Sequence, residues 1–241
     1  MISGIALRTE LLKTELGAAD PVDTLLDDYG RNHYAATYNG TNITVGQLVT
    51  GQWYQSFPQD AGDDYVNYAG TINAPWYVKA FKVWYCPIAE LTEGAISENI
   101  ILSKHTSVTH GFYRDANHSP NRIWFNMEDS LGGNNILSWS ITDYTAWYHL
   151  FGYMRSDGKR RVIINDIYSH TGAGISPDNH GSGTNVTASP VRVGGGVANR
   201  YDTCFIAEPK LFVGEMTRGE DDWWDDLAYR MFNSEKHLFG Y

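Results

Sequence analysis

The chain has 241 residues, a formal net charge of −10 and 24 glycines, and 14% of its residues are aromatic. The acidic balance argues against a nucleic-acid binder, which needs a basic face to displace the counterions of phosphates. No segment approaches the roughly 18 consecutive apolar residues of a membrane-spanning helix, and the N-terminus lacks a signal-peptide pattern, so we expect no membrane insertion. The aromatic and glycine content favours many short strands joined by tight turns.

The first 20 residues differ in texture from the rest of the chain. Four apolar residues fall near helical spacing, namely Ile5, Leu11, Leu12 and Leu16. Gly17 follows where a helix C-cap belongs, although an edge strand over residues 7–16 fits the pattern nearly as well. We therefore expect an N-terminal arm or packing element over residues 1–20, which closes one end of the fold or docks onto a partner subunit, and a single domain over residues 21–241.

The stretch from Leu25 to Gly40 has the pattern of a strand, a tight loop and a second strand. Gly30 and Asn32 tolerate positive φ, and the side chain of Asp28 can accept hydrogen bonds from the loop amides. This segment is predicted to open the sandwich-forming part of the chain.

Most of the remaining chain has the texture of strands, in several places with polar and apolar residues alternating, the mark of half-buried strands. Strands are expected over residues 47–50, 54–57, 64–68, 78–86, 100–104, 111–113, 121–128, 147–154, 160–165, 191–195 and 204–213. Trp84 is the expected core aromatic, and Asp157-Gly158 is a strong hairpin signal. The Gly-, Ser- and Asn-rich residues 169–189 are predicted to form a long surface loop.

A helix is expected near the C-terminus, over about residues 219–233. Thr217 and Glu220 form a capping-box pattern, and Asp221 follows in the first turn, where the helix dipole favours acidic side chains. Four residues share one apolar face, namely Trp224, Leu227, Ala228 and Met231. Cys86 and Cys204 are interpreted as buried free thiols, with a single disulfide as the alternative.

Several of these segments, taken in order from Leu25 to Asn233, resemble the LamG-like jelly rolls of the concanavalin A-like lectin/glucanase superfamily. The match is most specific at Trp147-Tyr-His-Leu-Phe-Gly-Tyr-Met-Arg-Ser-Asp-Gly and at Ile100-Ile-Leu-Ser-Lys104. The resemblance implies an all-β fold, a two-sheet antiparallel β-sandwich with a short C-terminal helix and an N-terminal arm or helix.

The resemblance also raises the question of a structural Ca²⁺, which many relatives hold between the opening Asp loop and the closing strand. Asp28 and Asn32 could supply oxygen ligands of the kind that Ca²⁺ requires. Lys210, however, stands where the family has Asp, and its ammonium would replace the cation and pair with Asp28. No other cofactor is expected, and the choice between ion pair and Ca²⁺ stays open.

The sequence gives no support for catalysis. Glycosidases of the superfamily carry Glu-x-Asp-x-Glu on one strand, which places the acids on one face, and no such triplet occurs here. Serine-nucleophile, zinc-protease and phosphate-loop motifs are also missing. His149 is interpreted as a half-buried histidine with its hydrogen bonds satisfied.

Candidate glycan contacts come from loop-like segments. Trp76 and Tyr144 could serve as stacking platforms, with Asp115 and His118 as hydrogen-bonding neighbours in a polar turn. The alternative is that these aromatic residues only fasten loops to the sandwich.

The leading functional hypothesis is a non-catalytic virion component, assembled in the host cytoplasm. As a capsid decoration or tail attachment protein it would contact other virion subunits, within an oligomer or larger assembly, and could also bind cell-surface glycans. One alternative is a cellular carbohydrate-binding module. Another is a glycoside hydrolase or lyase with an atypical acid pair.

Overall fold

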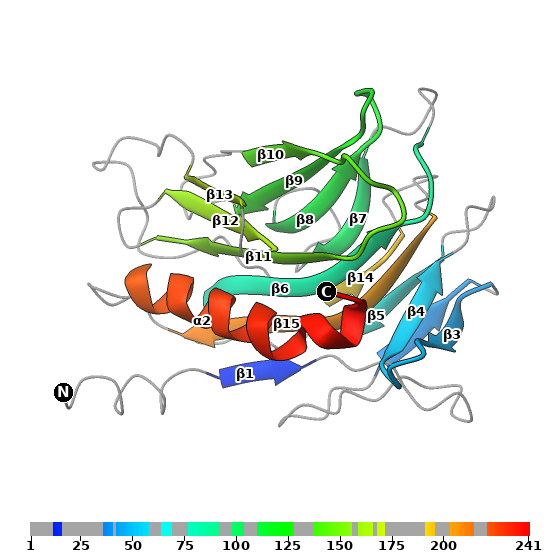
Figure 1. The fold of residues 1–241 in the computed structure, drawn as a ribbon, viewed down its shortest axis with the longest axis horizontal. Helices are drawn as coiled ribbons and strands as arrows, with labels where there is room; N and C mark the ends of the chain where they lie inside the picture. The colour runs from blue at the N-terminus through cyan, green and yellow to red at the C-terminus, as the bar shows by residue number, and fades with distance from the viewer. Residues whose placement is uncertain are drawn as a thin grey trace.

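A computed structural model provides the coordinates. It describes residues 12–15, 36–40, 42–57, 64–68, 77–91, 98–103, 110–127, 137–155, 159–165, 168–171, 191–195, 203–214 and 221–241. Within these residues the chain forms two antiparallel β-sheets stacked face to face, with one α-helix lying across the outside of the first sheet (Figure 1). The expected two-sheet β-sandwich is therefore confirmed.

The first sheet has eight described strands. Seven lie in the order β13 (Tyr168–Thr171), β12 (Arg160–Ile164), β11 (Tyr148–Met154), β6 (Tyr77–Pro87), β15 (Cys204–Gly214), β4 (Trp53–Phe57) and β3 (Thr44–Gln47). The eighth, β1 (Leu12–Glu15), pairs with the last part of β15, whose first part pairs with β4. Strand β15 thus has two successive neighbours along one edge, and its register against β6 shifts between Ala207 and Lys210.

The second sheet has seven described strands. Their order is β10 (Leu137–Ser140), β9 (Arg122–Met127), β8 (His110–Asp115), β7 (Glu98–Ser103), β14 (Val191–Val193), β5 (Tyr65–Tyr68) and β2 (Ala36–Asn39). Buried side chains from both sheets form one continuous core between them, with Phe81 of β6 packing edge-on against Phe125 of β9. The packing of side chains at alternate positions is what fixes the register of each strand.

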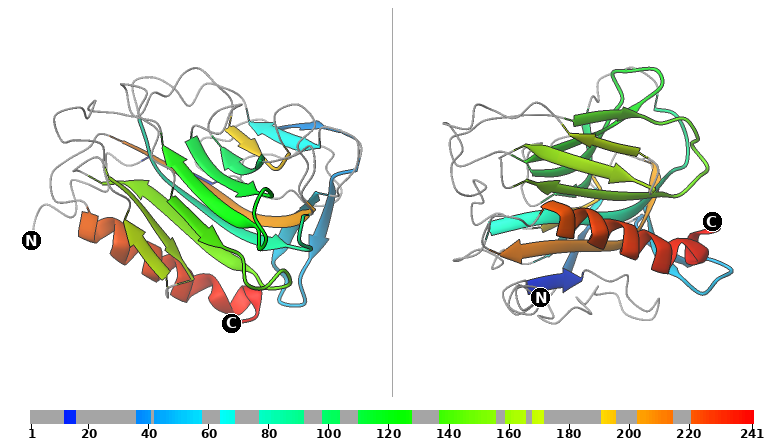
Figure 2. Two further views of the ribbon diagram at one scale, coloured as in Figure 1. Left: turned by 90° about the horizontal axis from the view of Figure 1, so that it is seen from above. Right: turned by 60° about the vertical axis from the view of Figure 1, so that its left-hand side comes forward.

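A second apolar layer lies between the first sheet and α2 (Asp221–Glu235) (Figure 2). Trp224 of the helix is 1% exposed and packs on Phe151 and Phe212 of the sheet. The 3₁₀ helix η2 (Lys236–Phe239) continues the cover, and the ring of Phe239 stacks on Trp84 at 4.1 Å between centroids. The core between the sheets covers one face of the first sheet, and α2 with η2 covers the other, so several of its strands are buried on both faces.

The predicted helix is confirmed from Asp221 onward and ends two residues later than expected, at Glu235, whereas its predicted start at residue 219 lies outside the described residues. Trp84 is buried as expected. Both cysteines are buried free thiols, also as expected. Cys204 faces the core between the sheets and Cys86 faces the helix-side layer, although their strands are neighbours. Successive side chains of a strand point to opposite faces, so the two thiols cannot meet.

Some predicted boundaries are wrong. The first short strand covers Thr44–Gln47 and not residues 47–50, because a tight turn follows in which Gly51 has a φ of +90° and its amide donates to the Leu48 carbonyl. The start of the predicted loop over residues 169–189 is instead part of β13, which pairs with β12.

Strand β1 supports the edge-strand reading of the N-terminal segment over Leu12–Glu15. Strand β2 and Gly40, with a φ of +97°, match the end of the opening segment. Pairing of β11 with β12 fits the predicted hairpin, whose turn lies outside the described residues. No helix in the described part of the chain is long and apolar enough to cross a membrane.

Candidate functional site

The turn between β8 and β9 presents a histidine held by a buried carboxylate. Asp115, the last residue of β8, has a fully buried side chain whose Oδ2 lies 2.6 Å from Nδ1 of His118. Its Oδ1 accepts a hydrogen bond of 2.9 Å from the Asn117 amide, which closes the turn. The His118 side chain is 40% exposed, and its Nε2 has no partner among the described residues. Asp115 therefore positions His118, and Nε2 is the atom left for a ligand.

A buried guanidinium supports this turn from beneath. Arg114 is fully buried and donates to Oδ1 of Asn121 at 2.7 Å, to the Ala89 carbonyl and to the Tyr85 hydroxyl. Asn121 in turn donates to the carbonyl of His118 at 2.9 Å. These bonds tie the β8–β9 turn to the segment after β6, so the position of His118 is set by buried groups.

The same asparagine connects a third segment to the turn. Oδ1 of Asn121 accepts from the Leu91 amide at 2.7 Å, and the Asn121 amide donates to the Tyr144 hydroxyl at 3.0 Å. The Tyr144 ring is partly buried and lies 5.6 Å from the Arg114 guanidinium, and burial raises the pKa of its hydroxyl. Three loops therefore converge at one end of the sandwich.

Two further polar side chains lie at the surface of this convergence. The hydroxyl of Ser119 donates to Oε1 of the exposed Glu90 at 3.0 Å. We call Glu90, His118, Ser119 and Tyr144 the rim cluster, and the buried Arg114, Asp115 and Asn121 its support. The rim cluster combines an aromatic ring, an imidazole nitrogen, a hydroxyl and a carboxylate, the side-chain types that bind hydroxyl-rich ligands.

Three of the four predicted ligand-binding residues thus meet, although Asp115 is buried and supports His118 instead of contacting a ligand. Trp76 and the predicted metal ligands Asp28 and Asn32 lie outside the described residues. So does the proposed ion pair of Asp28 with Lys210. No group of three or more His, Cys, Asp or Glu side chains that could hold a metal ion occurs among the residues that the structure describes.

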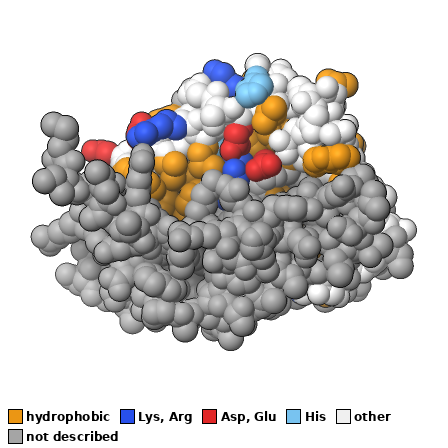
Figure 3. All heavy atoms as spheres, turned by 90° about the horizontal axis from the view of Figure 1, so that it is seen from below, with side chains coloured by type: hydrophobic (Ala, Val, Ile, Leu, Met, Phe, Trp, Pro, Cys, Tyr) orange, Lys and Arg blue, Asp and Glu red, His pale blue; other side chains and the backbone are white. Residues whose placement is uncertain are grey.

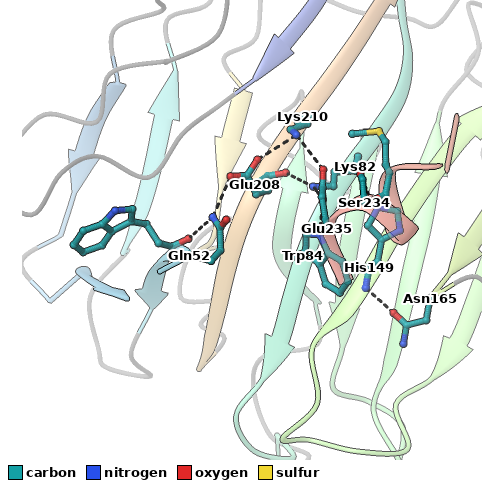
Figure 4. A network of polar contacts seen from close by, with 11 residues as sticks. Gln52, Lys82, Trp84, His149, Asn165, Glu208, Lys210, Ser234 and Glu235 are labelled. Atoms are coloured by element: carbon teal, nitrogen blue, oxygen red, sulfur yellow. Dashed lines mark hydrogen bonds and ion pairs between the residues drawn. The ribbon is translucent and has the colours of Figure 1, made fainter. Parts of the chain in front are cut away.

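A second polar arrangement lies on the outer face of the first sheet, at the C-terminal end of α2 (Figure 4). Lys82 and Lys210 are directly opposite on β6 and β15, and both are buried. Glu235, the last residue of α2, bridges them, with Oε2 at 2.5 Å from Lys82 Nζ and Oε1 at 3.2 Å from Lys210 Nζ. Glu235 also accepts a hydrogen bond of 2.6 Å from the Trp84 indole.

Glu208 completes this arrangement, with Oε2 at 3.1 Å from Lys210 Nζ. We call Lys82, Trp84, Glu208, Lys210 and Glu235 the helix-side network. Viewed from below, the described surface shows a small group of acidic and basic side chains among apolar ones (Figure 3).

The charged groups of the helix-side network shift one another's pKa values. Burial and the neighbouring Lys210 lower the pKa of Lys82 to about 7. Burial opposes ionisation of Glu235, but the ammonium groups of Lys82 and Lys210 prevail and lower its pKa to about 2. The pKa of Glu208 is lowered in the same way, against its burial, by Lys210 and Lys82.

These shifts bear on the hydrolase hypothesis, because Glu208 and Glu235 are two carboxylates that converge on one ammonium group. A glycosidase needs one carboxyl that keeps its proton near neutral pH, which requires a raised pKa. Both pKa values are lowered here, so this pair lacks the general acid.

The interpretation of His149 as half-buried and satisfied is wrong. His149 is 0% exposed, and neither ring nitrogen has a hydrogen-bond partner among the described residues. Its ring lies 5.0 Å from Trp84 and 5.8 Å from Phe232, between centroids, beneath the end of α2. Burial, and secondly the charge of Lys82, lower its pKa well below 6.5.

Sequence reasoning missed the helix-side network because Lys82 reads as a polar, solvent-facing position in an alternating strand. The available signal was that Ala80, Lys82 and Trp84 share one face, and that a predicted apolar helix needs a surface to cover. Nothing in the sequence states where the end of the helix meets that face.

No known family model matches the sequence, and no curated protein matches it. Solved structures do match the fold. The binding domain of paraclostridial mosquitocidal protein 1 aligns with a TM-score of 0.63 at 11% identity, over 95% of this chain and 53% of that chain. The binding domain of botulinum neurotoxin serotype D aligns with a TM-score of 0.62 at 10% identity, over 94% of this chain and 52% of that chain.

The binding domain of botulinum neurotoxin DC in complex with SialylT aligns with a TM-score of 0.61 at 12% identity, over 92% of this chain and 51% of that chain. The same binding domain has also been solved in complex with rat synaptotagmin II. The chain spans about half the length of these structures. At such low identity the likeness establishes the sandwich fold and carries no site residue across.

Proposed function

We propose that the chain is a non-catalytic recognition module that binds hydroxyl-rich glycans through the rim cluster. The observation that carries this proposal is the Asp115–His118 pair, in which a buried carboxylate fixes one ring nitrogen and leaves Nε2 to the outside. A pre-positioned donor or acceptor loses little conformational entropy when a ligand binds. Tyr144 and Glu90, beside the same turn, supply a ring and a charged acceptor for the ligand.

The structural relatives support a binding role without specifying it. They are binding domains, and that of botulinum neurotoxin DC was solved in complex with SialylT and in complex with rat synaptotagmin II. Because the likeness covers about half of each relative and is one of fold, recognition by this chain has to be tested on its own residues.

The test is a glycan array followed by calorimetry on the best ligand. Replacement of His118 by Ala should weaken binding at least tenfold, which corresponds to about 1.4 kcal/mol, the loss of one good hydrogen bond to a ligand. The matched control is His237→Ala, which removes an exposed histidine of η2 that shares no described hydrogen bond with the rim cluster. Equal binding by wild type and His118→Ala, or no glycan bound by the wild type, would contradict the proposal.

The expected setting, a phage virion in which the chain contacts other subunits, is part of the proposal and rests on sequence reasoning. Cryo-electron microscopy of particles that carry the chain tests it: the sandwich at repeated positions on capsid or tail supports the virion setting. Recovery of the chain beside a catalytic domain in a cellular fraction would favour the alternative, a cellular carbohydrate-binding module.

A further inference from the structure

Helix α2 is held on the sheet by two kinds of contact. Its apolar face packs on the sheet through Trp224, Ala228 and Met231. Its last residue, Glu235, accepts bonds from two ammonium groups and one indole of the sheet. Opening the helix would therefore expose an apolar face of the sheet and separate the ion pairs at the same time.

His149 lies beneath this closing contact. The elements packed around it contribute Lys82 from β6, Lys210 and Glu208 from β15, and Glu235 from α2 as the charged groups. The turn after β12 contributes the uncharged Asn165, whose Oδ1 accepts from the His149 backbone amide at 2.7 Å (Figure 4).

The imidazole therefore lies among aromatic rings, the charges of Lys82 and Lys210 oppose its protonation, and the charge of Glu235 favours an imidazolium. That carboxylate is already shared by Lys82, Lys210 and Trp84. A proton on His149 would have no hydrogen-bond partner in the closed state, and burying an unpaired charge is costly. Once α2 lifts away, water can solvate the same charge.

We propose that His149 makes the cover formed by α2 and η2 an acid-sensitive latch. The cover stays closed at neutral pH and opens more often as the pH falls below about 6.5, where an ordinary histidine takes up a proton. The latch is local, because the charge is relieved by lifting α2 without separating the two sheets. Opening uncovers the apolar outer face around Phe151, Phe212 and Trp84.

The sign of the effect follows from proton binding. The closed state keeps His149 neutral because its pKa is lowered, whereas the open state binds a proton below about 6.5. Acid therefore favours opening. The open population should rise by up to tenfold per pH unit below 6.5, the limit set by one proton. Glu235 adds to this only below 4.5, the ordinary value from which its pKa is lowered.

The test is hydrogen–deuterium exchange of the full chain at pH 7.5, 6.0 and 5.0, corrected for the intrinsic pH dependence of exchange. Protection of residues 223–235 should fall by up to tenfold between pH 6.0 and 5.0, while protection of β8 and β9 stays nearly constant. In His149→Phe, which fills the site without a titrating group, the fall should vanish. His237→Asn, an exposed histidine in η2, serves as the matched control and should behave as the wild type.

Two results would overturn the proposal: a fall in protection spread evenly over both sheets, or an unchanged fall in His149→Phe. Should the Phe variant not fold, nitrogen-15 NMR of the wild-type histidine side chains decides. An ordinary titration of His149 with α2 still protected would also overturn the latch, and a ring that stays neutral until α2 loses protection would support it.

Discussion

The rim cluster and the helix-side network are both polar, and both join segments that are distant in the sequence. They differ in how much hydrogen-bonding capacity remains for a ligand. In the helix-side network, Glu235 bonds three sheet groups and Lys82 is fully buried, so its bonding capacity is spent inside the molecule. In the rim cluster, His118 is partly exposed and is held from beneath by the buried Arg114 and Asp115. Its Nε2 has no partner among the described residues and can bond a ligand. Buried charge indicates architecture, and spare bonding capacity at the surface indicates recognition.

If the helix-side layer is architectural, its largest side chain should matter most to stability. Trp224→Ala removes a ring that is 1% exposed and should lower the free energy of unfolding by about 3–5 kcal/mol, the range for deleting a large buried aromatic. Urea denaturation followed by circular dichroism measures it. Trp223→Ala, at the half-buried neighbouring position, should cost clearly less; equal costs would mean that α2 packs differently.

The support of the rim cluster should also be structural, although the cluster itself is not. Asn121→Ala would leave the Leu91 amide and the Arg114 guanidinium short of partners in a buried place and should cost about 2–4 kcal/mol. It should also abolish ligand binding, because the turn that carries His118 loosens. Thermal melts with calorimetry check both. A stable variant with unchanged ligand binding would show that the turn needs no such support.

The helix-side network should give stability a dependence on pH in strong acid. Glu235 has a lowered pKa of about 2, so its contribution is complete above 4.5 and is lost as the pH falls from 4.5 toward 2. Glu235→Gln should cost about 1–3 kcal/mol at pH 6.5, because Lys82 loses its counter-charge. The difference from wild type should shrink at pH 3 in urea denaturation. Asp222→Asn, at an exposed position of α2, is the control and should show neither effect.

The smallest change in stability is expected at His118, the residue proposed to contact the ligand. His118→Ala should alter the free energy of unfolding by less than about 0.5 kcal/mol, as for surface positions in general. A cost of several kcal/mol in the same urea experiment would mean that His118 stabilises the fold, and would contradict the distinction between a structural network and a recognition surface.

Local patterns in the sequence were sufficient for much of the fold. Period-two alternation predicted most strands, and the capping box with four apolar residues predicted α2. Asp115 and His118 could be singled out because their contact is local, three residues apart within one turn. The roles of Lys82 and His149 could not be predicted, because they depend on where the distant residue Glu235 comes to rest on the sheet.

Strand β15 fitted the expected closing strand only loosely, and its register shift explains why. Ala207 faces the helix and Leu211 faces the core between the sheets, although unbroken alternation would place these two residues, four apart, on the same face. The surplus residue lies at Glu208, whose φ of +48° is unusual for a side-chain-bearing residue. If the strand instead alternated regularly through all of its residues, the Lys210 ammonium would point into the hydrocarbon interior and Leu211 would turn outward. A single irregular backbone position thus sets which face of the sheet the side chains in the second half of β15 occupy.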